Sequence, residues 1–504
     1  MRTLSSLSLS LLTMATITVL SGCAVGPDFK KPQAQVPADW SSLRAGDASL
    51  HDAVPPTGAA IASAEWWKPF GDPVLDGLEA DAATANPDLQ TAALRFAESR
   101  AQRQTAAAQR GPQVDMAASA QRQRPSENGA TSRTIDVLAP ADQRDTLVKL
   151  LSQPYTVYQG GFDASWEPDF WGRVRRSVEA ADAQVSSSGA LFDGARLDVA
   201  ADVARVYFAL RGTQRQIALT RADLDAAQDH FTLMKARADG GMASDLDTTQ
   251  QQALLADLRA RLPALLAEEA NALDQLSVLI GQTPGSLQAR LAPLADADTK
   301  PVLPSLALGI PSDVVRRRPD IRQAEAQLHE ATANTGVAVA DLYPRITLGG
   351  SFAFESLQSG DFGDWGSRHW SIGPSLDLPI FDMGRRRSVV TLRKLQQQEA
   401  AVTWQKSVLQ AWSDIDTALN AYSAERQRNA QLAERERLSR DAYSLADVRY
   451  RNGRTTFIEA LDAERTLLAA QRDRADSDAQ LAIRLVAIYK AIGGGDVPAA
   501  AVIR

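Results

Sequence analysis

Apolar residues recur every seven positions along the segment 173–239. One row and its companion row together contain Val199, Val203, Val206, Leu210, Ile217, Leu224, Ala227, Phe231 and Met234. This is the a/d pattern of helices that coil left-handed around their neighbours. The segment therefore predicts one very long helix in a coiled-coil-like assembly.

A second tract, 385–452, carries a similar pattern between Gly384 and Gly453 and has no internal proline or glycine. At 1.5 Å per residue, such a helix would be a rod of roughly 100 Å, far longer than an ordinary globular core. Its seam contains Val408, Trp412, Ile415, Leu419 and Tyr422 and then becomes polar at Asn429 and Glu436. The polar members predict a face toward water or a shared lumen, with a solvated outer face as the alternative.

The two tracts belong to an internal repeat. Asn86-Pro87-Asp88-Leu89 recurs as Arg318-Pro319-Asp320-Ile321 at an offset of 232, whereas Arg237 to Gly241 recurs as Arg449 to Gly453 at 212. A constant offset over more than 100 residues indicates duplication. The change of 20 residues predicts an insertion in the first copy, within the polar stretch 124–153.

Each copy is expected to contain, in order, a helix, a strand, a loop, a strand, a very long helix, a turn and a long helix. The first copy, 86–285, has predicted helices at 86–110, 173–239 and 244–280 and strands at 112–123 and 155–167. The second copy, 318–493, has predicted helices at 318–341, 385–452 and 456–491 and strands at 344–356 and 368–379. The remaining segments are a lipoprotein signal peptide (1–22), a lipid-anchored N-terminal segment that is extended or equatorial (23–85), a linker (286–317) and a tail (494–504).

All four strand segments alternate apolar and polar residues. The apolar positions are Val114, Met116, Ala118; Tyr158, Phe162, Trp166; Ile346, Leu348, Phe352, Phe354; and Trp370, Ile372, Leu376, Leu378. Strands of about ten residues with one apolar face are typical of a transmembrane barrel, whereas a sandwich strand with one wet face is the alternative. Aromatic residues near the strand ends, such as Trp171 and Trp365, favour the barrel.

Four strands do not close a barrel, and open sheet edges are not tolerated in lipid. The chain is therefore expected to oligomerise. A dimer would give eight strands with a filled interior, whereas a trimer would give about twelve strands, enough for a conduit. The predicted fold is mostly α, an internally duplicated helical coiled-coil barrel, with a membrane β-barrel closed by three chains.

The N-terminus has the pattern of a lipoprotein signal. Arg2 precedes an apolar run, Leu7 to Leu20, that ends at Leu20-Ser21-Gly22-Cys23. Cys23 is the only cysteine of the chain, which favours acylation, by palmitate for example, over an ordinary signal peptide. The run is also short of the about 20 residues that a membrane helix needs.

Composition argues against several other functions. A net charge of −7 and a pI near 5.4 disfavour nucleic-acid binding. The four histidines fall singly, so no metal-ligand cluster is expected. No phosphate-binding loop or nucleophile elbow is found, so we expect neither an enzyme nor a cofactor or metal site.

The order of the motifs resembles that of TolC-like outer membrane factors, specifically the NodT-type outer-membrane lipoproteins. The motifs are Cys23-Ala24-Val25-Gly26-Pro27-Asp28-Phe29, Trp66-Trp67, Asp72-Pro73, Asn86-Pro87-Asp88-Leu89, Arg318-Pro319-Asp320-Ile321, Leu342-Tyr343-Pro344 and Phe381-Asp382-Met383-Gly384-Arg385. The resemblance covers nearly all of the mature chain. It implies a lipid-anchored homotrimer in the outer membrane of a Gram-negative bacterium, with a twelve-stranded barrel and a periplasmic helical tunnel. The implied partners are a periplasmic adaptor and an inner-membrane pump, usually of the resistance-nodulation-division type, that exports drugs and other small molecules.

The helix-to-helix turns are the candidate functional sites. Gly453 suits a left-handed helix end, and the pairs Thr456–Glu459 and Ser244–Asp247 each predict a capping box. By resemblance, the tips also dock the adaptor. The residues expected there are Arg237, Gly241, Ser244, Asp245, Arg449, Tyr450, Gly453 and Thr456.

Asp462 matches the position whose acid lines the closed periplasmic aperture in this family. Three copies around a threefold axis would crowd three carboxylates, which resist full ionisation and favour cations. Glu459 is the second candidate, and a solvated acid near a helix N-terminus is the plain alternative.

Two other functions share parts of this pattern. A type I protein-secretion duct would have the same fold, and only its pump would distinguish it. A structural periplasmic coiled-coil lipoprotein would need no lipid-facing strands.

Overall fold

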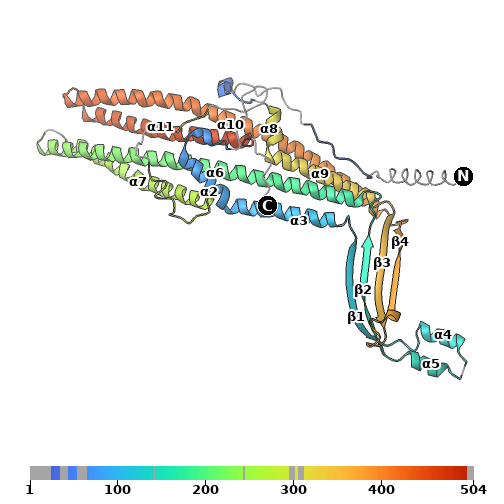
Figure 1. Ribbon diagram of the computed structural model, residues 1–504. Coiled ribbons are helices and arrows are strands. Elements are labelled where there is room, and N and C mark those ends of the chain that lie inside the picture. The colour runs from blue at the N-terminus through green and yellow to red at the C-terminus, as the bar shows by residue number, and fades with distance from the viewer. Residues whose placement is uncertain are drawn as a thin grey trace, which may run out of the picture. The chain divides into compact units, whose positions relative to one another are not determined.

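The computed structural model describes residues 24–33, 44–53, 65–140, 142–241, 244–293, 301–304 and 311–495. The chain forms two compact units. One comprises residues 1–30, 100–184 and 328–399, and the other comprises residues 31–99, 185–327 and 400–504. The sheet belongs to the first unit, and the helix tips belong to the second (Figure 1).

The duplication is visible in the elements. The first copy contains α3 (Pro87–Ala108), β1 (Gln113–Gln123), β2 (Tyr155–Trp166), α6 (Arg173–Asp239) and α7 (Asp245–Leu279). The second contains α9 (Pro319–Ala340), β3 (Arg345–Ser356), β4 (Arg368–Asp377), α10 (Arg385–Arg451) and α11 (Phe457–Ala491). The paired helices have equal lengths of 22, 67 and 35 residues. The predicted order of elements is confirmed.

The extra residues of the first copy lie between β1 and β2. They include two short helices, α4 (Ala130–Leu138) and α5 (Arg144–Leu151). The corresponding connection between β3 and β4 contains only a short 3-10 turn, η4 (Trp365–Ser367). The insertion predicted within 124–153 is therefore where the structure departs from the repeat.

The predicted extended or equatorial segment, 23–85, contains helices at its C-terminal end. Residues Pro73–Ala85 form α2, and a short 3-10 turn, η3 (Lys68–Phe70), precedes it. The Asp72 carboxylate accepts hydrogen bonds from the backbone N–H groups of Val74 and Leu75 at 2.9 and 3.4 Å, an N-cap that also places Pro73 at the first helical position. A further turn, η2 (Ala48–Ala53), lies in the same segment, and α8 (Pro311–Arg317) lies in the predicted linker.

The four strands form one antiparallel sheet in the order β1-β2-β3-β4 (Figure 1). Their register aligns Met116, Phe162, Phe352 and Trp370 in a single row across the sheet. Directly opposed residues share a face, so the apolar positions predicted on separate strands gather on one side. All four side chains of this row are exposed. The strands β1 and β4 form the two edges of this sheet.

The N-terminal residues 24–29 pack against the helix ends next to the sheet. The Val25 backbone N–H donates to the Trp171 carbonyl at 3.0 Å, and Arg176 pairs with Asp28 at 2.5 Å. Gly26 has φ +95, and a Cβ atom there would lie 2.6 Å from the Gly336 Cα. A side chain at position 26 would therefore force the two backbones apart. Cys23 lies outside the described residues.

The helical core contains the predicted seam. Val203, Leu210 and Ile217 of α6 are fully buried, and Ile415 and Leu419 of α10 belong to the same hydrophobic cluster as Val203 and Leu210. Their counterparts nearer the helix tips, including Ala227 and Met234, belong to a second buried cluster. This burial is what the spacing by seven residues requires.

The prediction that Asn429 faces water or a lumen is wrong. Its side chain is buried and donates to Ser477 Oγ at 3.1 Å and to Asp478 Oδ1 at 2.9 Å on the facing helix α11. The amide is therefore satisfied inside the helix pair, which removes the cost of burying it. Glu436, the other polar member of the seam, is partly exposed and pairs with Arg440 of its own helix.

The repeated Asn-Pro-Asp and Arg-Pro-Asp motifs have equivalent contacts. Asn86 donates to the Leu279 carbonyl near the end of α7 at 2.8 Å and accepts from the Leu89 N–H at 2.9 Å. Arg318 donates to the Ala491 carbonyl near the end of α11 at 2.6 Å. Each motif thus starts one helix and satisfies a terminal carbonyl of another, which would otherwise lack a partner.

In the parts of the chain that the structure describes, no helix combines the length and the apolar character that a membrane crossing requires.

Candidate functional site at the helix tips

The turns at the helix tips begin with glycine in the left-handed region. Gly241 follows α6 with φ +70, and Gly453 follows α10 with φ +66. After α10, the Gly453 N–H bonds to the Tyr450 carbonyl at 2.9 Å and the Arg454 N–H bonds to the Arg449 carbonyl at 2.8 Å. This is a Schellman motif, so the predicted left-handed helix end at Gly453 is confirmed.

One of the two predicted capping boxes forms. Ser244 Oγ accepts from the Asp247 N–H, and the Asp247 carboxylate accepts from the Ser244 N–H, both at 3.2 Å. The box predicted for Thr456 and Glu459 is wrong, because Thr456 is the N-cap of α11 without a side-chain cap hydrogen bond. Glu459 instead accepts from the hydroxyl of Thr455. The neighbouring threonine thus competes successfully for the same carboxylate.

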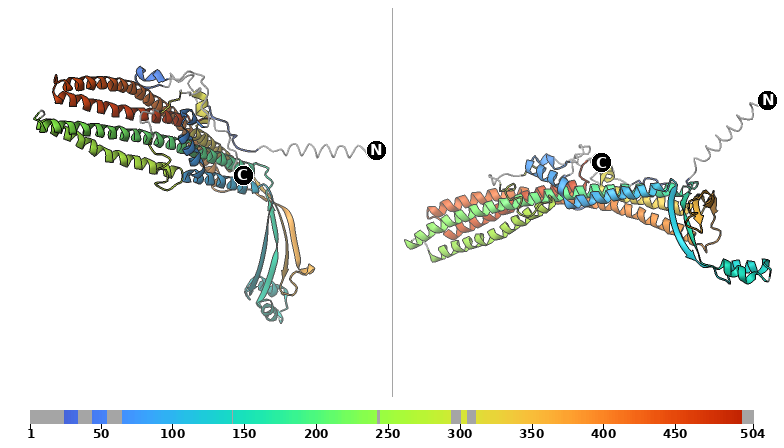
Figure 2. Two further views of the ribbon diagram at one scale, coloured as in Figure 1. Left: turned by 60° about the vertical axis from the view of Figure 1, so that its left-hand side comes forward. Right: turned by 60° about the horizontal axis from the view of Figure 1, so that its bottom comes forward.

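The two hairpins, α6–α7 and α10–α11, contact each other close to their turns and run side by side there (Figure 2). Arg237 Nη1 donates to the Tyr450 hydroxyl at 3.3 Å, and its guanidinium lies 5.7 Å from the centre of the Tyr450 ring. The same ring lies 5.5 Å from Phe457. Arg237 and Tyr450 were predicted as residues that dock the adaptor. In the structure both side chains are half-buried and contact each other.

A second contact between the hairpins joins His230 of α6 to Glu464 of α11, with Nδ1 and Oε1 3.5 Å apart. The Glu464 carboxylate raises the pKa of His230 by a hydrogen bond, against the opposing effect of burial. Two turns earlier on α6, burial raises the pKa of Asp223 to about 6, and Arg472 partly offsets this. The pairing of His230 with Glu464 was not predicted, because neither residue stands in a motif and the two lie more than 200 positions apart.

The contact of His230 predicts a pH effect on the tips. A histidine whose folded pKa is raised contributes stability that is fully present below its unfolded pKa of about 6.5 and is lost as pH rises through the folded pKa. We expect the hairpins to loosen, and amide hydrogen exchange at the helix tips to become faster relative to its intrinsic rate, as pH rises above 6.5. In the variant His230→Gln, this pH dependence should be absent, and a wild-type profile in that variant would contradict the assignment.

The remaining candidate residues are exposed. Glu459 and Asp462 lie on the face of α11 opposite to the buried Leu461 and Glu464. Gly241, Ser244, Asp245, Arg449, Gly453 and Thr456 are exposed at the turns. The exposed acids are thus free to face another molecule, whereas the buried side chains on the opposite face of α11 hold the hairpins together.

The apolar face of the sheet is the second candidate site. The apolar side chains that are more than 65% exposed on this face include Met116, Trp370, Ile372 and Leu376. Surfaces that face water rarely expose large apolar patches, and a large patch marks a site of interaction with a protein or a membrane. The opposite face carries the row Asp115, Asp163, Ser351 and Ser371. The sheet therefore has one side suited to lipid and one side suited to water.

Comparisons with known proteins identify the family of this chain. Residues 79–282 and 310–494 match the family model described as outer membrane efflux protein. The chain is 32% identical over 460 residues to the pyoverdine export outer membrane protein OpmQ of Pseudomonas putida, covering 91% of this chain and 92% of that protein. It is 29% identical to nodulation protein T of Rhizobium leguminosarum bv. trifolii, covering 96% of each chain. The solved structure of the outer-membrane channel OprN is 31% identical and superposes with a TM-score of 0.81, covering 94% of this chain and 99% of that one.

The chain therefore belongs to the outer membrane efflux protein family. The resemblance to TolC-like channels and to NodT is confirmed, as is the predicted fold class. The relatives are outer-membrane channel proteins rather than enzymes. A purely structural coiled-coil spacer, the alternative from another class, does not account for the exposed apolar face.

Proposed function

We propose that three copies of this chain form the exit duct of a tripartite efflux system. The observation that carries the proposal is the apolar row Met116, Phe162, Phe352 and Trp370, exposed on a sheet with two open edges. In lipid, unpaired backbone groups at such edges cost several kcal/mol each. Pairing β1 of one chain with β4 of the next removes every edge, and three chains supply about twelve strands, enough for an open bore.

The proposed anchor is a lipid on Cys23. The next residue, Ala24, packs against Gly172, where an added Cβ would come within 2.9 Å of the Ala24 Cα. Residue 24 is thereby held beside Trp171 and Phe170, aromatic residues at the sheet end of α6, and aromatic residues of this kind gather at membrane interfaces. An acyl chain on Cys23 would start at that interface. Substituting Cys23 by Ser should abolish labelling by radioactive palmitate.

The proposed partners are a periplasmic adaptor, at the exposed turns of the hairpins, and an inner-membrane pump of the resistance-nodulation-division type behind it. The exposed turn residues Gly241, Ser244, Asp245, Gly453 and Thr456 supply the docking surface. Crosslinking at these turns in cells, followed by identification of the adaptor, tests this part. If the crosslinked product contains the adaptor of a type I protein-secretion system, the function is protein export and not the export of small molecules.

We further propose that Asp462 lines the closed periplasmic aperture of the trimer, with Glu459 as the second candidate for the tightest ring. Its carboxylate lies on the exposed face of α11, so three copies around an axis would form a ring of acids. Such a ring attracts cations and binds them at the constriction.

The variant Asp462→Ala is expected to raise the ion conductance of the purified trimer in planar bilayers, because it removes the ring and widens the constriction. Asp473→Ala is the matched control, since Asp473 lies on the same helix in an exposed ion pair with Arg435 at 2.6 Å. Unchanged conductance in Asp462→Ala, with an increase in Glu459→Ala, would move the ring to Glu459. No change in either variant would remove the assignment.

A further inference from the structure

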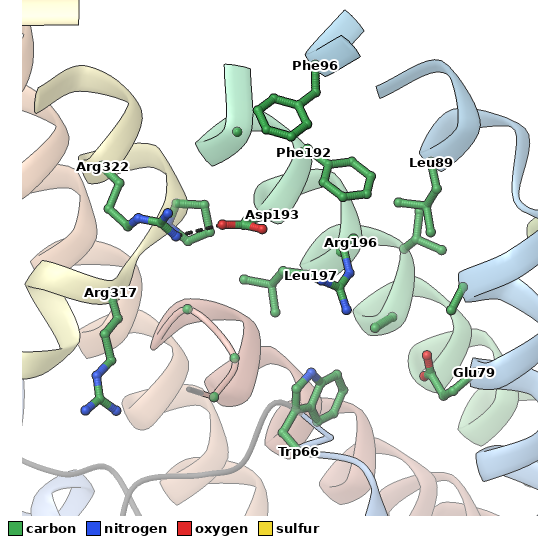
Figure 3. A pocket seen from close by; sticks show the side chains of 18 of the residues that line it. Trp66, Glu79, Leu89, Phe96, Phe192, Asp193, Arg196, Leu197, Arg317 and Arg322 are labelled. Carbon is green, nitrogen blue, oxygen red and sulfur yellow. Dashed lines mark hydrogen bonds and ion pairs between the residues drawn. The ribbon is translucent and has the colours of Figure 1, made fainter. Parts of the chain in front are cut away.

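A cavity of about 610 Å³ lies in the second unit, between α2, α3, α6, α8, the start of α9 and the end of α11 (Figure 3). Cavities of roughly 300–1,000 Å³ with apolar walls and a few polar groups are the usual sites for small organic ligands. The channel function proposed above makes no use of this cavity. Its walls therefore call for a separate explanation.

The apolar walls are aromatic and aliphatic. Trp66, Leu89, Phe96 and Phe192 line the cavity, and the rings of Phe96 and Phe192 are parallel with their centres 6.4 Å apart. Parallel and edge-on aromatic side chains present flat apolar surfaces. The body of the ligand is therefore expected to be flat or aliphatic.

Glu79 of α2 extends into this cavity (Figure 3). The residue is only 3% exposed, and among the described residues its Oε1 atom has no hydrogen-bond partner. A buried polar atom without a partner costs about 1–3 kcal/mol and calls for an explanation. Burial, together with the nearby Asp76 charge, raises the pKa of Glu79 to about 9. At neutral pH the carboxyl group is thus uncharged and able to donate a hydrogen bond.

Positive charge lines the rest of the cavity. Arg196, Arg316, Arg317 and Arg322 contribute to its lining, and Asp193 is the one acid there besides Glu79. Asp193 is paired with Arg322 at 2.7 Å. Arg196 is exposed, and its guanidinium lies 6.0 Å from the centre of the Phe192 ring. Arg317 Nη1 is buried and has no hydrogen-bond partner within the described chain. The excess of guanidinium groups favours an anion, and guanidinium suits planar oxyanions in particular.

We propose that this cavity binds an amphipathic organic anion, with its apolar body against Trp66, Phe96 and Phe192, its anionic group toward Arg196 and Arg317, and a neutral acceptor atom at Glu79. The inference goes beyond the export duct and does not depend on it. An occupied cavity would connect α2 and α8 to α6 through the ligand.

Isothermal titration calorimetry of the purified trimer in detergent tests the proposal, with naphthalene-2-sulfonate as the probe and N-methylquinolinium as a cation of matched size. We expect saturable binding of the sulfonate, one per chain, and much weaker binding of the cation. Arg196→Glu should weaken sulfonate binding about tenfold, the loss of one charge-assisted contact. The control Arg221→Glu, an exposed arginine further along α6, should leave it unchanged.

Variants of Glu79 separate an anion from a cation site. Glu79→Gln keeps a neutral donor and is expected to leave sulfonate binding within about threefold of wild type, whereas Glu79→Leu removes the donor and should weaken binding further, by about 1 kcal/mol or fivefold. Tighter binding of N-methylquinolinium that Glu79→Gln abolishes would overturn the proposal in favour of a cation site. Absence of sulfonate binding, or sulfonate binding that Arg196→Glu does not change, would also overturn it. None of these binding results bears on the conductance of the trimer. A failed binding test would therefore leave the proposed channel function unchanged.

Discussion

Replacing Ile372 by arginine is expected to prevent the protein from accumulating in the outer membrane. Ile372 lies mid-strand in β4 and is 73% exposed on the apolar face. An arginine on the lipid face near the bilayer midplane costs about 2–4 kcal/mol per copy, and three copies incur it together in a trimer. Fractionation of membranes, followed by detection of the protein, should show the variant reduced several-fold or degraded.

The matched control is Ser371→Arg, one residue earlier on the same strand. Ser371 lies on the opposite face, in a row with Asp115 and Asp163, where a cation meets acids and water. This variant should reach the outer membrane at the wild-type level, since substitutions on the lumen side change selectivity rather than insertion. Equal levels of Ile372→Arg and Ser371→Arg would mean that the apolar face does not contact lipid.

Replacing Asp478 by alanine is expected to cause the largest loss of stability in the helical unit. The carboxylate is 6% exposed and joins three helices. It accepts from Arg215 of α6 at 2.8 Å, pairs with Arg474 of α11 at 3.0 Å and accepts from Asn429 of α10 at 2.9 Å. Removing one partner of a buried ion pair costs about 3–5 kcal/mol, because the remaining charge is left without that compensation. Thermal unfolding of the purified protein, followed by the helical circular dichroism signal, should show a clearly lower midpoint.

The control for this prediction is Asp473→Ala on the same helix. Asp473 pairs with Arg435 at 2.6 Å, but both side chains are close to half exposed. An exposed ion pair contributes about 0–1 kcal/mol, so the midpoint should hardly move. Similar midpoints for the two variants would show that the network around Asp478 does not stabilise the helices.

The elements and the faces could be predicted because each depends on residues close in sequence. Helix periodicity placed Leu210 and Ile217 in a seam, and alternation placed Phe352 and Ile372 on an apolar face. The repeat then set the limits of the elements, and the ends of the ten helices and strands assigned to the two copies lie within two residues of those predicted. Glycine at 453 signalled a helix end through its backbone freedom alone.

The contacts that sequence analysis missed join distant parts of the chain. Asn429 looked like a solvent-facing seam residue, because its partners Ser477 and Asp478 lie about 50 positions further along the chain. Glu459 accepts from the Thr455 hydroxyl instead of the Thr456 backbone N–H, a local choice that residue type alone does not decide. The pairing of Arg237 with Tyr450 and the turning of Glu79 into a cavity required the packed structure.

We propose that the sheets of three chains complete one membrane channel. Native mass spectrometry of the full-length protein, extracted from outer membranes in detergent, measures the number of chains directly. A complex of three chains is expected, and it should aggregate when detergent is withdrawn. A monodisperse, water-soluble monomer, obtained without detergent from the Cys23→Ser variant, would contradict it.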